Sequence, residues 1–195
     1  MADSTKTAGI DLHDAGSYLW TWKTAYNTTT DEHQPYTVAI EKEHQHIHDG
    51  LGFTLSGKIT GLGAGATAYM LFITDSAIPH FRAADVKTSG APVDFTLYED
   101  STVSANGAAL TPRNNNRRSA TTATMLCYSG PTVTGVGTIL ETSFIPSTSS
   151  GRTGGEASKI GAEWIFDTAT NYLVRITNND SQAINIGYSF FWYEA

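Results

Sequence analysis

The sequence predicts an all-β fold, an antiparallel, jelly-roll-like β-sandwich preceded by an extended N-terminal arm. From Tyr36 onward, short apolar runs alternate with clusters of Gly, Pro, Asn and Ser, a pattern typical of sandwiches and barrels. The final run, Ile184–Tyr193, places apolar side chains at every second position, as a strand with one buried face does. No stretch carries the sustained apolar stripe of a helix.

The length of 195 residues suits one well-buried core, so we expect residues 1–35 to form the arm and residues 36–195 a single sandwich domain. In the arm, Tyr18, Trp20 and Trp22 alternate as on one face of a short strand. Such aromatic side chains need cover from the domain's own core or from a neighbouring subunit. Trp20 and Trp22 are therefore candidate interface residues.

Within the domain, each apolar run bounded by turn residues predicts a strand. We expect the last strand, whose alternating pattern is the clearest, to be central to the core. Its far end is apolar on both faces, so we expect another layer or subunit to cover it on both sides. The predicted strands are Tyr36–Ile40, Leu51–Ile59, Thr67–Thr74, Val93–Tyr98, Ala123–Tyr128, Val136–Phe144, Ala162–Phe166, Tyr172–Thr177 and Ile184–Tyr193.

Two stretches between these runs are not predicted to be strands. Ser76–Lys87 is the most helix-like part of the chain, but it contains Pro79 and has no apolar stripe. The Gly/Ser-rich stretch Pro146–Gly155 is predicted to be a long loop. The single cysteine, Cys127, sits in an apolar run and is expected to be a small buried side chain.

Charge and composition narrow the classes of partner. The formal net charge is -7 and only 16% of the residues are charged, which argues against a phosphate-binding surface and so against nucleic acid. The uncharged Ser, Thr, Asn and Gly surface suits packing against other proteins. No basic segment followed by an apolar one opens the chain, and no run of about 20 apolar residues follows, so we expect synthesis in the cytoplasm and no membrane partner.

The sharpest candidate for metal chemistry is the segment containing His44, His46 and His48. On an extended segment these three imidazoles would share one face, close enough for two to bind one divalent metal ion. The pattern is similar to the His-x-His of cupins, but the later Glu and the second cupin motif are absent. The alternative is a solvated, pH-sensitive segment that leads into the next strand. We expect no other cofactor.

The glycine-rich segment Gly61–Ala66 formally matches the dinucleotide-binding pattern. Because the β-like residues 67–74 follow it, no helix N-terminus would face a pyrophosphate. We therefore interpret the glycines as a tight β-hairpin turn. No nucleophile motif accompanies a base elsewhere, so the sequence predicts no catalytic residue and a protein that is not an enzyme.

The most distinctive polar segment is Phe95–Ser119, which has an acidic corner followed by an Asn/Arg cluster. Amide and guanidinium groups suit repeated hydrogen bonds to backbone carbonyls and carboxylates. We expect Glu99 and Arg117, supported by Asn114 and Asn116, to form a polar lock. The lock would either fix the loop end of the sandwich or join two subunits.

Three segments together resemble small virion proteins of tailed bacteriophages: HIHDGLGFTLSG, LYEDSTVS with NNNRRS, and YLVRITNNDSQAINIGYSFFWYE. The resemblance covers roughly residues 40–195 and is strongest at the polar centre and in the aromatic-rich C-terminal strand. Glu99, Asn114, Asn116 and Arg117 would be the family's central polar positions. It implies a decoration, or cement, protein: a non-enzymatic β-sandwich, often a homotrimer, that binds the major capsid protein and stabilises the head by bridging capsomers. The implied location is the capsid surface of the virion.

Two other functions are consistent with the same residues. A receptor-binding domain of a tail or fibre would share the all-β pattern and the uncharged surface. A cupin-like metal-dependent enzyme would use His44, His46 and His48 as ligands.

Overall fold

The computed structural model describes residues 22–27, 32–37, 42–88, 91–146 and 163–194. The chain divides into two compact units, residues 1–45 and residues 46–195. The elements of the described part are β1 (Trp22–Asn27), β2 (Glu32–Thr37), α1 (Lys42–His48), β3 (Gly52–Leu62), β4 (Thr67–Ile73), β5 (Pro79–Thr88), β6 (Val93–Glu99), β7 (Thr102–Ala105), β8 (Ala108–Leu110), β9 (Arg113–Asn114), β10 (Leu126–Ser129), β11 (Thr132–Gly135), β12 (Thr138–Ile145), β13 (Trp164–Ile165), β14 (Asn171–Asn178) and β15 (Ile184–Glu194).

The N-terminal unit contains one antiparallel strand pair, β1 with β2. Trp22 is the first residue of β1 and lies opposite Thr37. Trp20 and Tyr18 lie outside the described residues. The boundary of the unit falls after Gln45, whereas the sequence placed the end of the arm at residue 35.

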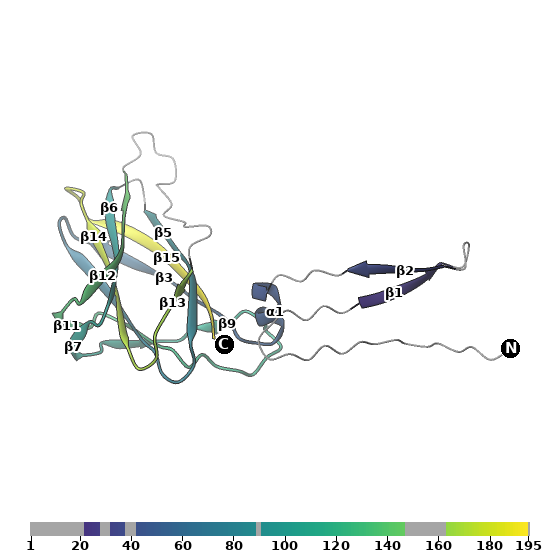
Figure 1. Cartoon of the computed structure of the whole chain (residues 1–195). Coiled ribbons are helices and arrows are strands. Elements are labelled where there is room, and N and C mark those ends of the chain that lie inside the picture. The colour runs from purple at the N-terminus through teal and green to yellow at the C-terminus, as the bar shows by residue number, and fades with distance from the viewer. Residues whose placement is uncertain (1–21, 28–31, 38–41, 89–90, 147–162, 195) are drawn as a thin grey trace. The chain divides into compact units, whose positions relative to one another are not determined.

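The second unit is built on two antiparallel sheets that enclose one core (Figure 1). The six-stranded sheet has the order β12-β6-β14-β4-β10-β8, and the five-stranded sheet has the order β13-β5-β15-β3-β9. Aromatic rings from both sheets meet between them: Phe72 of β4 contacts Phe81 of β5 and Phe190 of β15 edge to face. The prediction of an all-β sandwich is confirmed.

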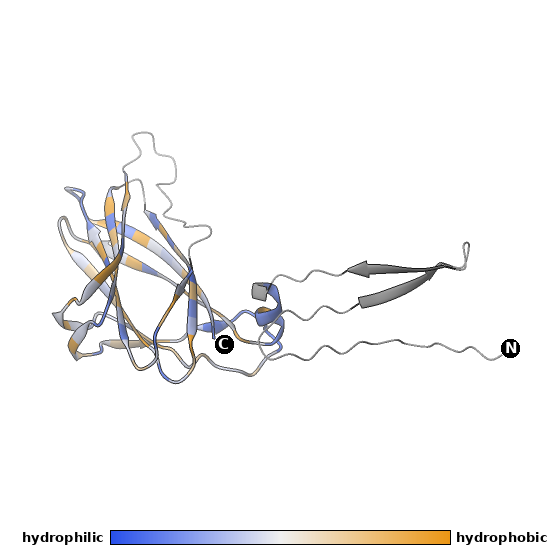
Figure 2. Ribbon diagram, in the orientation of Figure 1, coloured by the Kyte–Doolittle hydropathy of each residue, from blue (hydrophilic) through white to orange (hydrophobic). Residues whose placement is uncertain are grey.

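The core follows the period-two pattern of the strands, visible as alternating colours along the ribbons of Figure 2. On β15, Ile184, Ile186, Phe190 and Trp192 are all buried, and β15 lies in the middle of its sheet between β3 and β5. This confirms the predicted central strand. Truncation of a fully buried aromatic side chain such as Trp192 typically costs about 3 to 5 kcal/mol.

A third layer covers part of the six-stranded sheet on the side away from the core. Strands β7 and β11 form a two-stranded sheet. Val103 and Val133, from these two strands, pack against a second buried cluster made of Leu71, Tyr98 and Leu173. One end of this outer face is therefore apolar and covered.

The glycine-rich turn between β3 and β4 connects the two sheets instead of closing a hairpin, so the predicted hairpin is wrong. Gly61 and Gly65 adopt positive φ there, which favours glycine. Asn178, fully buried at the end of β14, donates from Nδ2 to the carbonyls of Leu62, Gly63 and Gln182. The buried side-chain amide of Asn178 thus holds the connection that crosses from one sheet to the other. As predicted, a strand and not a helix follows it.

Two further predictions are wrong at the level of secondary structure. The helix-like stretch beginning at Ser76 contains strand β5, whose bulge opposite Phe191 and Trp192 interrupts the period-two pattern. The His-rich segment, expected to be extended, forms helix α1. The sequence also missed the short strands β7, β8, β9 and β11.

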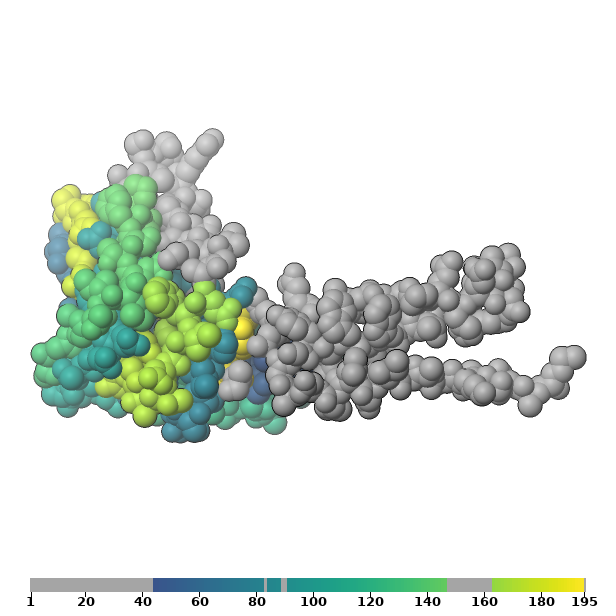
Figure 3. All heavy atoms as spheres, viewed as in Figure 1, coloured from purple at the N-terminus to yellow at the C-terminus, as the bar shows by residue number. Residues whose placement is uncertain are grey.

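Strands β12 and β13 lie side by side on one face of the unit, coloured green and yellow-green in Figure 3. Trp164 of β13 donates from Nε1 to Glu141 of β12 at 3.1 Å, which joins the two sheets at this side. Cys127 is buried as expected, and burial, with the nearby charge of Glu194, raises the pKa of its thiol to about 12. Within the described part of the chain, no helix has the length and apolar character needed to cross a membrane.

Candidate functional site

The Asn/Arg segment forms a set of hydrogen bonds that we call the Asn clasp: Asn114, Asn115 and Asn116 against residues 48–54. Asn114 lies in β9, opposite Phe53 of β3. Its Nδ2 donates to the carbonyls of Gly50 at 2.7 Å and Thr121 at 2.9 Å, and its Oδ1 accepts from the backbone N–H of Asn116. Asn114 is only 8% exposed. Loss of any of these hydrogen bonds would therefore leave a buried polar group without a partner.

The neighbouring residues extend the clasp toward the surface. Asn116 donates from Nδ2 to the carbonyl of His48 at 2.8 Å. Asn115 donates its backbone N–H to Gly52 and accepts from the Thr54 hydroxyl. Gly50, with φ of +77°, follows α1, and a side chain at this position would collide with Ser119. The clasp therefore joins the start of β3 to a loop about 65 residues later in the chain.

Glu99 and Arg117 have separate partners within the chain. Arg117 reaches the carbonyl of Asn114 through a long bond of 3.4 Å, while Glu99, at the end of β6 in the other sheet, accepts from the Tyr172 hydroxyl at 2.8 Å. Burial raises the pKa of Tyr172, and the bond to Glu99 raises it further. No ion pair of the described residues connects Glu99 with Arg117.

The histidines lie on helix α1, and this overturns the geometry on which the metal hypothesis rested. Residues two apart in a helix point in nearly opposite directions, so His46 points away from the side that carries His44 and His48. The His46 ring stacks on Tyr193 at a centroid distance of 4.4 Å. Over the described ranges, no three His, Cys, Asp or Glu side chains are grouped to hold a metal ion.

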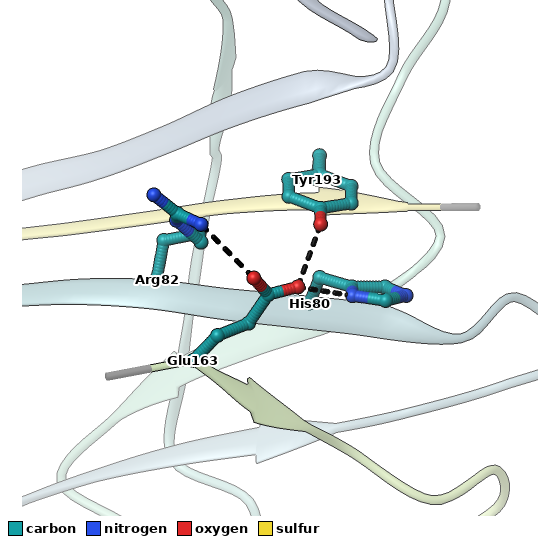
Figure 4. A network of polar contacts seen from close by, with 4 residues as sticks. All are labelled: His80, Arg82, Glu163 and Tyr193. Carbon is teal, nitrogen blue, oxygen red and sulfur yellow. Dashed lines mark hydrogen bonds and ion pairs between the residues drawn. The ribbon is translucent and has the colours of Figure 1, made fainter. Parts of the chain in front are cut away.

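A second polar group, which we call the Glu163 cluster, comprises His80, Arg82, Glu163 and Tyr193 (Figure 4). One carboxylate oxygen of Glu163 accepts from the Tyr193 hydroxyl at 2.6 Å and also contacts Nδ1 of His80. The other accepts from Arg82 at 3.0 Å. Since His80 and Arg82 lie on β5 and Tyr193 on β15, the carboxylate ties the start of β13 to two strands of the sheet.

The electrostatics of the cluster keep Glu163 ionised. Burial alone would raise the pKa of its carboxyl, but the hydrogen bonds from Tyr193, His80 and Arg82 outweigh burial and lower the pKa to about 2. Near neutral pH a carboxylate this acidic is a weak base, so the arrangement suits a fixed charged contact better than proton transfer. The rings of His46 and His80 both stack on Tyr193. Ring packing therefore stabilises the cluster in addition to its charged hydrogen bonds.

A third polar group, centred on Glu194, was not predicted from the sequence. Glu194, buried at the end of β15, accepts from the backbone and hydroxyl of Thr124, from the backbone of Met125 and from the indole of Trp192. It fixes the segment that enters β10. An acidic residue beside an aromatic strand end gives no signal of this role, because Thr124 and Met125 are about 70 residues away in sequence.

All three groups fasten connecting segments to strands of the all-β unit. No protein-family model matches this chain, and no curated protein matches it.

Proposed function

We propose that the protein is a non-enzymatic structural protein of a tailed-bacteriophage virion, and specifically a decoration protein on the capsid surface. Its partners would be further copies of itself and the major capsid protein, and its role would be to bridge capsomers and stabilise the head.

The observation that carries the proposal is the convergence of the three segments that resemble phage virion proteins. The first, residues 46–57, pairs through β3 with β15 of the third segment. The second contributes β6, which pairs with β14 of the third, and the Asn clasp, which bonds to the first. Residues far apart in sequence that carry the resemblance thus build one packed unit, as expected if they specify a common fold.

The surface of this unit supports a protein-binding role. Among the described residues, Ile139, Phe144 and Ile165 are large apolar side chains with 59%, 60% and 63% of their surface exposed. They lie on β12 and β13, which adjoin one another. Ile139 and Phe144 project from the same face of β12, so this edge strand carries exposed apolar side chains of the kind that contact other proteins.

The location of the protein in the particle tests the proposal. Purified virions are separated into heads and tails, and each fraction is analysed by mass spectrometry and by immunogold labelling against the full chain. We expect the protein on heads, and we expect recombinant full chain to rebind heads from which it has been stripped. Labelling at the tail tip with binding to host cells would replace the proposal with a receptor-binding function, and absence from the particle would refute both.

A further inference from the structure

The outer face of the six-stranded sheet is only partly covered by β7 and β11. Beyond them, two rows of side chains cross the strands β12, β6, β14 and β4 in register and point away from the core. We call these rows the outer patch; they are Thr142, Thr96, Arg175 and Tyr69, followed by Phe144, Asp94, Thr177 and Thr67. Apart from Tyr69, the patch has two ionisable groups, one of each sign.

Arg175 has unmet hydrogen-bonding capacity. Its guanidinium carbon lies 5.1 Å from the centre of the Tyr98 ring, and it makes no hydrogen bond or ion pair with any residue in the described part of the chain. The Nε atom is buried without a partner, as is the hydroxyl of Thr96 on the adjacent strand. Arginine keeps its charge at all accessible pH values and carries five N–H donors, so a carboxylate is its natural partner.

Asp94 is the complementary group. It lies on the same face as Arg175, opposite Thr177, and no ion pair of the described residues includes it. The two charges cannot simply be paired as they stand, because Tyr98 and Asp94 lie on opposite sides of Thr96 along β6. The guanidinium over Tyr98 is directed away from Asp94. Each copy therefore presents one unpaired charge of each sign on a surface of hydroxyl groups and the 60% exposed Phe144.

The geometry points to the outer patch as the surface on which a second copy of this chain docks, with Arg175 of each copy against Asp94 of the other. A two-fold axis lying in the interface between the two positions would form the contact twice and join two copies, where the resemblance implies three. Each copy has a net charge of -7, so copies associate most readily where opposite charges meet. This inference deepens the proposed function, on which it rests, by naming the surface through which copies join.

A charge exchange tests the inference on the full chain. Sedimentation equilibrium is measured for the wild type, Arg175→Asp, Asp94→Arg and the variant that carries both changes. We expect each single change to weaken self-association about tenfold or more, and the double change to recover most of the loss, because the pair is restored with its signs reversed. The exposed Arg113 of β9 supplies a matched control, Arg113→Asp, which should associate like the wild type.

Near-UV circular dichroism verifies the fold of each variant, and the neutral changes Arg175→Gln and Asp94→Asn replace any variant that does not fold. A wild type that remains a single copy at its highest soluble concentration overturns the inference, as does a folded double variant with no recovery. If the charge changes leave self-association unaltered while the protein still binds heads, the inference fails and the proposed function stands. If association follows them but the protein is absent from virions, the proposed function fails and the inference stands.

Discussion

The Asn clasp and the Glu163 cluster both fasten a remote segment to the five-stranded sheet, yet they use different chemistry. In the clasp, the neutral side-chain amides of Asn114 and Asn116 bond to backbone carbonyls and N–H groups. In the cluster, one carboxylate is shared by a phenol, an imidazole and a guanidinium. The clasp should therefore hold at any pH at which the protein folds, whereas the contribution of the cluster depends on the ionisation of Glu163.

The largest effect should come from Asn114→Ala. This change removes two donors and one acceptor from a site that is only 8% exposed, and it leaves the carbonyls of Gly50 and Thr121 without those bonds. We expect a loss of about 3 kcal/mol in the free energy of unfolding. Urea denaturation followed by fluorescence measures it, and the loss should be the same at neutral and mildly acidic pH.

The exposed Asn106 in the turn before β8 provides the control for this change. Asn106→Ala should stay within about 0.5 kcal/mol of the wild type. If the two variants were equally stable, the clasp would have no special part in the fold.

Glu163→Gln should have an intermediate effect that depends on pH. Because 27% of the side chain is exposed, solvent screens the interactions and we expect a loss of about 1 kcal/mol at neutral pH. The pKa of Glu163 falls from its ordinary value of 4.5 to about 2 in the fold, so the stabilisation is fully present above pH 4.5 and disappears as the pH falls to 2.

Unfolding free energies of the wild type and Glu163→Gln, measured over this range of pH, should converge at the acidic end. The difference between the wild type and Asn114→Ala should not converge. If the difference in unfolding free energy between the wild type and Glu163→Gln stayed constant with pH, the charge of Glu163 would not be what holds the start of β13 in place.

A loss of similar size is expected for Asn116→Ala. Its bond to the His48 carbonyl is exposed to solvent, so water replaces much of what is lost, and we expect about 1 kcal/mol. Comparison with Asn114→Ala by urea denaturation separates the buried and the exposed parts of the clasp. Equal losses would show that burial does not set the strength of these bonds.

The smallest effect should be that of Arg117→Ala, although the sequence singled this residue out. Its bond to the Asn114 carbonyl is long, at 3.4 Å, and we expect a change within about 0.5 kcal/mol. Thermal unfolding at low protein concentration measures this contribution within one copy. A drop as large as that of Asn116→Ala would restore Arg117 to a central place in the clasp.

Much of the fold could be read from the sequence because the main strands carry their own signals. β6 and β15 are apolar at alternate or successive positions, and the structure buries those side chains. The Asn-rich segment was also recognisable, since consecutive amides and guanidinium groups have few uses other than hydrogen bonding. Its contacts with His48 and Gly50 could not be predicted, because the pairing of β9 with β3 brings them together.

The misses have physical causes. β5 begins at Pro79 and contains a bulge, so neither its start nor its period follows the usual pattern. Helix α1 has only seven residues, too few for a periodic signal, and short helices owe their stability to packing. Glu163 meets His80, Arg82 and Tyr193 from 83, 81 and 30 residues away, which no local motif records.

Because Cys127 is buried and unreactive, a dye can be attached at a chosen position of the protein. With its pKa raised to about 12 and its side chain buried in β10, the natural thiol has almost no thiolate at neutral pH and no route to a reagent. A new cysteine placed on an exposed turn would therefore be the main site of reaction with a maleimide dye, without first removing the native one. Single fluorophores could thus report distances between neighbouring copies or between a copy and a capsid.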